Sequence, residues 1–215
     1  EGDPAVSILL GLGDGSFASA VTMNVSGYPT SLATGDLDGD GHADLIVTSG
    51  AHTVLAFRGD GLGAFGLVQT FDTVESPRSV SIGHFDGDTR PDILVASYSG
   101  GIALHLAQAD GTLGAARVYS PGYGLTEAII GDVDGDALSD VILTNSQTQT
   151  MSVMLGNGLG ALWPGQSFPA ANNPYAAVVA DLNQDGFADI VTADNDAATL
   201  SVYFQARLAG ATIAF

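Results

Sequence analysis

The sequence contains no cysteine and no lysine, and its only basic residues are five arginines, set against 24 acidic residues and a formal net charge of −19. Disulfide bonds therefore play no part in its stability. A nucleic-acid-binding protein needs a basic surface to neutralise phosphates, so nucleic acid is excluded as a partner. An anionic membrane surface is disfavoured for the same reason. No apolar run approaches the roughly 18 residues of a transmembrane helix, so membrane insertion is not expected.

The sequence also lacks any stretch with the sustained 3.6-residue periodicity of an amphipathic helix. Short runs of β-branched and apolar residues occur instead, bounded by Gly and Asp, and Leu45–Thr48 and Val54–Arg58 are examples. Such runs are typical of β-strands. With 215 residues, 46% of them hydrophobic, the chain is long enough to bury a sizeable core. These features predict an all-β protein.

An acidic loop punctuated by glycine recurs four times. The copies are Asp36–Asp44 (DLDGDGHAD), His84–Asp92 (HFDGDTRPD), Asp132–Asp140 (DVDGDALSD) and Asp181–Asp189 (DLNQDGFAD). Their first residues are separated by 48, 48 and 49 residues. A fixed period of this length indicates one supersecondary unit that is copied along the chain.

A second motif recurs in step with the loop. Its copies are Gly13–Phe17, Gly61–Phe65, Ala109–Leu113 and Gly158–Leu162, and each ends 19 residues before the next acidic loop. Two independent motifs that stay in phase over four copies establish that the repeat is real. We therefore treat residues 1–215 as one repeat domain with units of approximately 6–53, 54–101, 102–150 and 151–199 and a partial unit at 200–215.

Each unit reads as four strands, A to D. In one unit these are Ser31–Thr34 before the acidic loop, Leu45–Thr48 after it, Val54–Arg58, and Val68–Phe71 after the glycine-rich turn. Strand C is apolar on both faces, which indicates a sheet that is covered on both sides. Four-stranded sheets of this kind, repeated every 40–50 residues, are typical of the blades of a β-propeller. We expect four full antiparallel blades from Ser31 onward, preceded by an N-terminal half-blade with strands C and D only.

The acidic loops are candidate metal sites. Oxygen ligands at loop positions 1, 3, 5 and 9, with a backbone carbonyl at position 7, suit a hard cation of the size of Ca²⁺. The alternative is an ordinary surface turn rich in Asp and Gly, but four phased copies favour three to four Ca²⁺ sites. The candidate ligands are Asp36, Asp38, Asp40, His42 and Asp44; Asp86, Asp88, Arg90 and Asp92; Asp132, Asp134, Asp136, Leu138 and Asp140; and Asp181, Asn183, Asp185, Phe187 and Asp189.

Two loops depart from the pattern. His84 replaces the first aspartate of the second loop, and Thr89 replaces the glycine at position 6. In the third loop Ala137 stands at position 6, where a positive φ is usual and costs a non-glycine residue about 1 kcal/mol. We expect the first loop to bind calcium most tightly and the second most weakly.

The sequence resembles the FG-GAP repeats, also called VCBS repeats, that build the β-propeller of integrin α-chains and many bacterial secreted proteins. Val6–Phe17 is similar to the strand-and-turn signature of that family, and Asp36–Asp44 is similar to its calcium loop. The resemblance implies blades with calcium in the A–B hairpin, and a secreted or cell-surface location. It also implies a ring of seven blades, more than this chain holds, so we expect further blades from a longer chain or self-association.

Four tyrosines are candidate ligand-binding residues. Tyr28, Tyr123 and Tyr175 fall in connections from strand D to strand A, and Tyr98 falls in a B–C connection. In a propeller both kinds of connection emerge on the face opposite the calcium loops. Tyrosines at such positions suit recognition of a protein or a carbohydrate. The alternative is that they are ordinary loop residues.

Together these features predict a calcium-binding module for adhesion or ligand recognition. The alternatives are a structural protein whose blades pack into a filament or surface layer, and an accessory domain of a polysaccharide-degrading enzyme. No arrangement of nucleophile, base and acid stands out, and His105 shares a slot with Phe57 and Met154, which indicates a packed core histidine. We therefore expect no enzymatic activity.

Overall fold

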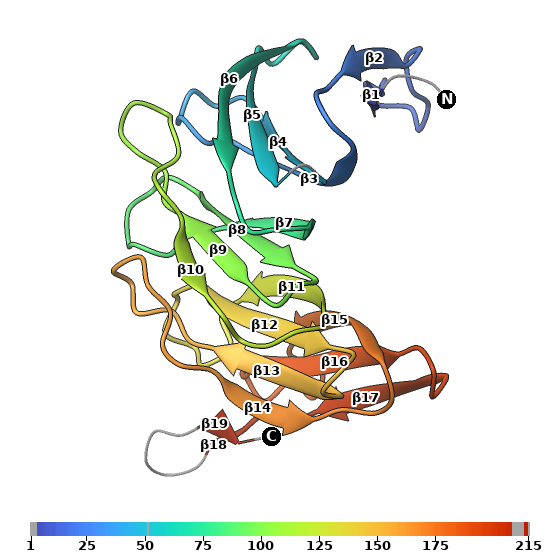
Figure 1. The fold of residues 1–215 in the computed structure, drawn as a ribbon, viewed down its shortest axis with the longest axis vertical. Coiled ribbons are helices and arrows are strands. Elements are labelled where there is room, and N and C mark those ends of the chain that lie inside the picture. Colours follow the sequence, from blue (N-terminus) through green and yellow to red (C-terminus); the bar gives the residue numbers. More distant parts are fainter. Residues whose placement is uncertain (1–3, 51, 208–212, 215) are drawn as a thin grey trace.

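The structure is a computed structural model that describes residues 4–50, 52–207 and 213–214. Every regular element in these ranges is a β-strand (Figure 1). No helix with the length and hydropathy needed to cross a membrane occurs among the described residues.

Three four-stranded antiparallel sheets form the centre of the molecule. The first contains β3 (Pro29–Gly35), β4 (Asp44–Ser49), β5 (Thr53–Gly59) and β6 (Phe65–Asp72). The second contains β7 (Pro77–Gly83), β8 (Asp92–Ser97), β9 (Ile102–His105) and β10 (Arg117–Tyr119). The third contains β11 (Leu125–Gly131), β12 (Asp140–Asn145), β13 (Thr150–Met154) and β14 (Gln166–Pro169). In each sheet a strand pairs with the next strand along the chain, so the prediction of repeated four-stranded blades is confirmed.

The blades lie side by side through their first strands. β3 contacts β7, β7 contacts β11, and β11 contacts β15 (Pro174–Ala180). Figure 1 shows the blades following one another in chain order from the N-terminal to the C-terminal end of an open array. The A strands therefore form the inner row, and the D strands lie on the outside.

The core fills the spaces between blades. Ile46 of the first blade packs with Val80 and Ile93 of the second, and Leu104 of the second packs with Val141 of the third, in two separate clusters. Strands β4, β8 and β12 are buried along their whole length, as expected for sheets covered on both faces. His105 is 1% exposed, as predicted for a core residue. Its Nδ1 lies 3.0 Å from the carbonyl oxygen of Gly114, its ring packs on Phe71, and burial lowers its pKa.

The two ends of the array are incomplete. At the N-terminal end β1 (Ala5–Ile8) and β2 (Val21–Asn24) form the expected half-blade, a sheet of two described strands. At the C-terminal end β15, β16 (Asp189–Asp194) and β17 (Thr199–Tyr203) form a three-stranded sheet, and β18 (Ala206–Arg207) pairs separately with β19 (Ile213–Ala214). The fourth strand that we expected to complete the last blade near Phe215 falls partly outside the described residues. No strand among the described residues links the two ends, so these sheets do not close into a ring.

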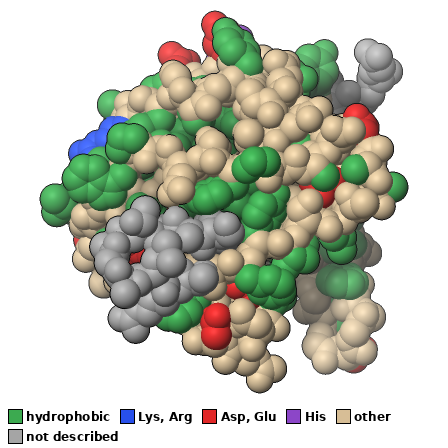
Figure 2. All heavy atoms as spheres, turned by 90° about the horizontal axis from the view of Figure 1, so that it is seen from below, with side chains coloured by type: hydrophobic (Ala, Val, Ile, Leu, Met, Phe, Trp, Pro, Cys, Tyr) green, Lys and Arg blue, Asp and Glu red, His purple; other side chains and the backbone are tan. Residues whose placement is uncertain are grey.

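No described strand covers the outer face of the last blade. Leu200 is 70% exposed, and Val202 and Phe204 are also exposed. Figure 2 shows this end of the molecule, where hydrophobic side chains are interspersed with polar ones. The two-sided burial expected for strand C therefore holds for β5 up to Phe57, for β9 and for β13. It fails at β17, because no further blade packs on this strand within the described residues.

Candidate calcium loops and a hollow on the opposite face

Each acidic loop connects the A strand of a blade to its B strand, and its last aspartate is the first residue of the B strand. In the first blade the buried carboxylate of Asp44 accepts one hydrogen bond from the N–H of Leu37 and one from the N–H of Gly59, both at 2.9 Å. Asp92, Asp140 and Asp189 make the same pair of bonds in their blades. The carboxylate at position 9 therefore joins the start of the loop to the end of strand C, or to the short segment just after it.

The carboxylate at position 1 organises the backbone of the loop. Oδ1 of Asp36 accepts the N–H groups of Gly39 and Asp40 at 2.8 and 3.1 Å, and Oδ2 accepts the N–H of Gly41 at 2.9 Å. Both glycines have positive φ, 79° and 86°, which glycine adopts without a steric penalty. The loop thus wraps around one carboxylate, and the third loop repeats this pattern around Asp132.

Carboxylates converge in two of the four loops. One carboxylate oxygen from each of Asp36, Asp38 and Asp40 lies within 4.8 Å of the others, and Asp132, Asp134 and Asp136 form an equivalent group. Three negative charges this close repel one another, and hard oxygen donors in this arrangement fit Ca²⁺. The donor set of these two loops therefore fits the ion that the sequence predicts.

Burial and neighbouring charges shift the pKa values of two aspartates in the third loop. Burial, assisted by the nearby charges of Asp134 and Asp136, raises the pKa of Asp140 to about 6, although its two hydrogen bonds act in the opposite direction. Burial and the charge of Asp136 also raise the pKa of Asp134. A cation bound by these groups would favour their ionised forms.

Position 6 of the third loop shows the expected backbone conformation. Ala137 has φ 66°, and its N–H donates to Oδ2 of Asp132 at 2.9 Å, as the N–H of Gly41 does to Asp36 in the first loop.

The fourth loop is built similarly, with Asp181 accepting the N–H groups of Asp185 and Gly186. Its Asn183 side-chain amide donates to the Asp185 carboxylate at 3.0 Å, so one of the expected oxygen ligands is an amide with its own partner.

The second loop is different. Nδ1 of His84 lies 3.2 Å from the carbonyl oxygen of Arg90, the oxygen expected at position 7 of a calcium loop. The guanidinium of Arg90 forms an ion pair with the carboxylate of Asp88. Thr89 does not adopt a positive φ, unlike the residue at position 6 of the other loops. The charge of Asp88 is therefore balanced from within the loop, and these residues do not fit a calcium ion as those of the first and third loops do.

Position 7 residues behave alike in all four loops. The N–H groups of His42, Arg90, Leu138 and Phe187 each donate to the carboxylate at position 5 of their loop.

A basic side chain from another element also reaches the first loop, where Arg58 of β5 forms an ion pair with Asp38. The sequence gives no sign of this pair, because Arg58 lies 20 residues from Asp38 along the chain.

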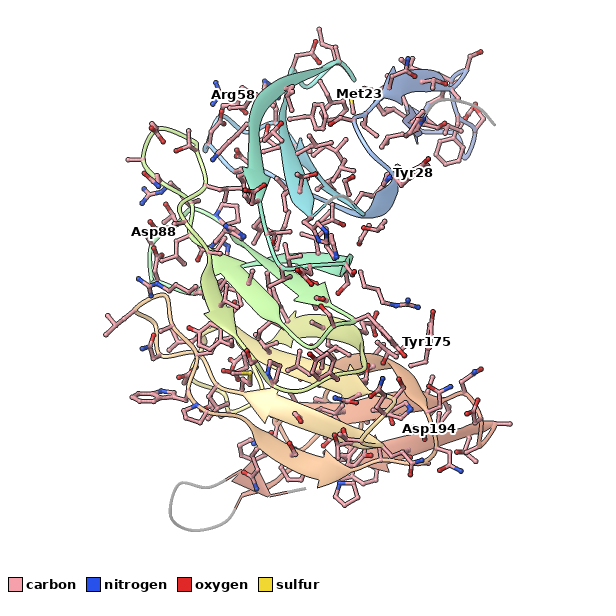
Figure 3. The ribbon with its side chains drawn as sticks, viewed as in Figure 1. Met23, Tyr28, Arg58, Asp88, Tyr175 and Asp194 are labelled. Carbon is pink, nitrogen blue, oxygen red and sulfur yellow. The ribbon has the colours of Figure 1, made fainter. Side chains whose placement is uncertain are left out.

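Tyrosines and acidic loops lie on opposite sides of the array, as predicted. Figure 3 shows Arg58 and Asp88 along one side, and Tyr28, Tyr175 and Asp194 along the other. Tyr98 and Tyr175 line a hollow with a volume of about 730 Å³ on this second side. Tyr28 and Tyr123 do not line it and are 77% and 69% exposed. The structure therefore brings together two of the four predicted tyrosines.

The hollow is built from equivalent residues of successive blades. The pairing of each A strand with its B strand is interrupted by a β-bulge near its start, and the residue left unpaired points to the hollow. These bulge residues are Thr30, Arg78, Thr126 and Tyr175. A bulge changes the direction of a side chain, and such features are common next to functional sites. The proline that precedes the bulge in three blades was visible in the sequence, but its consequence was not.

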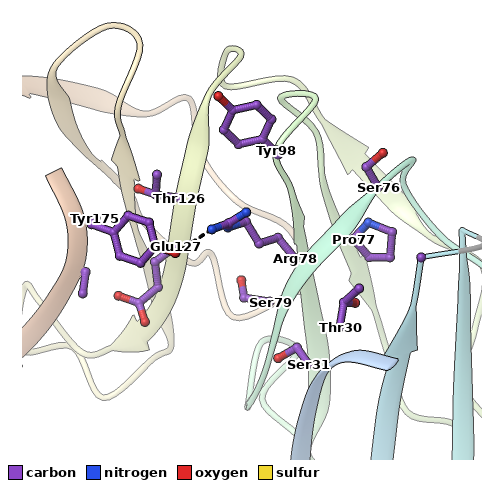
Figure 4. A pocket seen from close by; sticks show the side chains of 12 residues that line it. Thr30, Ser31, Ser76, Pro77, Arg78, Ser79, Tyr98, Thr126, Glu127 and Tyr175 are labelled. Atoms are coloured by element: carbon purple, nitrogen blue, oxygen red, sulfur yellow. Dashed lines mark hydrogen bonds between the residues drawn. The ribbon is translucent and has the colours of Figure 1, made fainter. Parts of the chain in front are cut away.

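Arg78 occupies the centre of this site. Its guanidinium carbon lies 5.9 Å from the ring centre of Tyr98 and 5.5 Å from that of Tyr175, within the range of cation–π interactions. It also donates a hydrogen bond to the Tyr175 hydroxyl at 2.6 Å (Figure 4). Glu127 lines the same hollow, but it forms no ion pair with Arg78 and accepts the N–H of Ala177. The sequence alone assigned Arg78 no role.

Comparison with known proteins supports the architecture. The profile of the FG-GAP-like repeat matches residues 1–47, 36–95, 84–143 and 132–192. No curated protein sequence matches the chain.

Solved structures give the same result at low sequence identity. A protein from Lactobacillus plantarum superposes with a TM-score of 0.70 at 16% identity, over 98% of this chain and 63% of that one. BBS1N in its complex with ARL6DN superposes with a TM-score of 0.59 at 15% identity, over 83% of this chain and 57% of BBS1N. An Agrocybe aegerita lectin that recognises non-reducing terminal N-acetylglucosamine gives 0.59 at 19% identity, over 88% and 55%. The chain thus spans less than two thirds of the length of these structures, and the likeness shows the fold.

Proposed function

The chain belongs to the FG-GAP-like repeat family, and from this we propose that it is a calcium-stabilised β-propeller module that recognises a protein or glycan ligand. Ions occupy one side of the blades in this proposal, and the ligand binds the other. We also propose that the protein works outside the cell or at its surface, where millimolar calcium suits sites with dissociation constants of roughly 10⁻⁴ to 10⁻³ M.

The convergence of carboxylates in the first and third loops carries the calcium part of the proposal. The backbone of these loops is already shaped by Asp36 and Asp132, so little reorganisation is needed for an ion to bind. In the fourth loop Asp181 holds the backbone in a similar way. We therefore propose three sites, with the second loop excluded because Arg90 supplies its positive charge.

The recognition part rests on the hollow. Most of its lining residues lie on the A strands, Tyr98 is in a B–C connection, and the hollow combines two aromatic rings with an arginine and several hydroxyl groups. Sites on a rigid scaffold that present such groups favour binding. The lectin and the ARL6DN-bound BBS1N show that proteins of similar fold recognise a sugar or bind a protein, which supports this use of the fold.

That the chain has no enzymatic activity stays a prediction from the sequence. The hollow holds one carboxylate, that of Glu127, and no histidine stands beside it among the described lining residues. A role as accessory domain of an enzyme would use the same recognition site and would place the chemistry elsewhere.

Calcium titration of protein stripped with a chelator tests the proposal. Calorimetry should give about three sites, and the melting temperature should rise with calcium. At ten times the dissociation constant each site contributes about 1.4 kcal/mol to the folded state. Magnesium at equal concentration is the control, since it is smaller and prefers strict octahedral geometry. A melting temperature that is the same with calcium and with chelator would overturn the calcium part.

A structural role in filaments is the second candidate, favoured by one observation. Leu200, Val202 and Phe204 form an exposed apolar row at the last blade, where a further blade or another subunit could pack. Electron microscopy separates the two candidates, because open-ended fibres favour the structural role and discrete particles favour the module.

A further inference from the structure

Arg78 differs from the other described arginines in its partners. Of the arginines whose side chains the structure describes, Arg58 and Arg90 pair with carboxylates, and Arg117 donates to the carbonyls of Leu159 and Gly160. Arg78 has no carboxylate partner among the described residues, although the net charge is −19. It is exposed, at the surface of a hollow, with an aromatic ring on each of two sides (Figure 4).

The guanidinium retains donors for a ligand. A guanidinium carries five N–H groups, and one of the nitrogens of Arg78, Nη2, donates to the Tyr175 hydroxyl. The group makes no other hydrogen bond among the described residues, so its remaining N–H groups are available. Two parallel N–H donors match the two oxygens of a carboxylate, and such charge-assisted pairs are stronger than neutral hydrogen bonds. The rings limit the motion of the side chain, which reduces the entropy lost on binding.

The rest of the lining suits a sugar ring. Tyr98 and Tyr175 are 45% and 48% exposed, so part of each ring is available for stacking on the C–H face of a pyranose. The hydroxyls of Ser76 and Ser79 have no hydrogen-bond partner among the described residues, and Thr30 adds a third hydroxyl to the wall. Short hydroxyl side chains both donate and accept, as sugar hydroxyls require.

The charge of the whole protein restricts the ligand further. A net charge of −19 repels a densely charged polyanion before it reaches Arg78. A short oligosaccharide with isolated carboxylates is repelled far less and still offers the group that Arg78 binds.

We propose that the hollow binds a sugar residue that carries a carboxylate, of the uronic acid type, with Arg78 on the carboxylate and Tyr98 and Tyr175 against the ring. This inference rests on the proposed recognition function and specifies its ligand class.

Calorimetry with calcium-loaded protein tests it, with digalacturonic acid and its carboxyl-reduced counterpart as a matched pair of probes. The acid should bind at least about tenfold more tightly than the reduced sugar. Arg78→Gln should remove this preference, so that the two sugars bind with equal affinity, whereas Arg78→Lys should retain part of it. Tyr175→Ala should weaken both probes, and Tyr123→Ala, which changes a tyrosine outside the hollow, should affect neither. Unchanged calcium-dependent melting shows that each variant is folded.

Several results would overturn the inference. Equal affinity for the two sugars, or a preference that survives Arg78→Gln, removes the role of Arg78 but leaves a neutral glycan as ligand of the same module. Binding of a peptide with a C-terminal aspartate, without binding of either sugar, makes the ligand a protein. No binding of either sugar or of the peptide by the folded, calcium-loaded protein rejects the carboxylate site. If, in addition, a broad panel of glycans and proteins shows no ligand affected by Tyr98→Ala or Tyr175→Ala, the recognition function fails as well.

Discussion

The carboxylate of Asp140 accepts a hydrogen bond from the backbone N–H of Gly156 at 2.9 Å, which joins the end of the third acidic loop to the turn after strand β13. The close approach leaves no room for a side chain, because a Cβ on Gly156 would lie 2.3 Å from the carbonyl oxygen of Ser139. The first blade repeats this relationship between Asp44 and Gly59. A buried carboxylate therefore joins the loop to the end of strand C. The two segments approach this closely because the residue after the strand is a glycine.

Gly156→Ala should lower the free energy of unfolding by about 1–3 kcal/mol, because the added methyl group meets rigid backbone. Gly11→Ala is a matched control at the equivalent position of the half-blade, where a Cβ would meet nothing within 4 Å. We expect the control to change stability by less than about 0.5 kcal/mol. Thermal and urea unfolding measure both, and equal losses in the two variants would show that the close approach is unimportant.

Asp140 should make stability depend on pH in calcium-free protein. Its folded-state pKa of about 6 lies above the ordinary aspartate value of 3.8, so its contribution to stability is full below about pH 4 and is lost as the pH rises through 6. The difference in unfolding free energy between the wild type and Asp140→Asn should therefore decrease from pH 4 to 6 and then level off. The lowered pKa of His105 makes stability rise with pH, which is the opposite trend. Because His105 is present in both proteins, its contribution cancels in this difference. A difference that increases with pH would contradict the assignment.

Asp134→Ala should remove calcium binding by the third loop, since it deletes one of three converging carboxylates. Calorimetric stoichiometry should fall from about three ions to about two. Asp86→Ala changes the same loop position in the second loop, where Arg90 already balances Asp88, and should leave the stoichiometry unchanged. Loss of one ion from Asp86→Ala would show that the second loop binds calcium despite its arginine.

Arg58→Gln should strengthen calcium binding by the first loop. The guanidinium of Arg58 pairs with Asp38 and competes with the ion for this carboxylate. An ion pair near the surface contributes about 0.2–1 kcal/mol, so the gain should be up to about fivefold in affinity. Arg78→Gln removes a positive charge from the opposite side and serves as the control. Weaker binding by Arg58→Gln would mean that the arginine positions Asp38 for the ion.

Substitution of Leu200 and Val202 by serine should reduce self-association of the chain. Both residues are exposed on the uncovered face of β17, and burying such an apolar row between subunits would favour association. Light scattering over a range of concentrations measures the change. Leu62→Ser, which alters a single leucine that is 82% exposed in the turn between β5 and β6, is the control. A wild-type chain that stays monomeric at all concentrations would contradict this prediction.

The sequence by itself determined the repeat, the order of strands within each blade and the place of the acidic loops. These features depend on local chemistry: short runs of β-branched and apolar residues form strands, and Asp and Gly form the turns between them. The positive φ at Ala137 could be predicted in the same way, because the equivalent position holds glycine in two other loops.

Only the tertiary structure decided which residues meet between blades. Arg78 and Tyr175 are 97 residues apart, and they touch because bulges at equivalent positions of two A strands point toward one hollow. Arg58 reaches Asp38 because strand C returns beside the loop. The exposed row on β17 follows from how many blades pack together. Such contacts depend on blade packing and side-chain direction, which no local pattern in the sequence specifies.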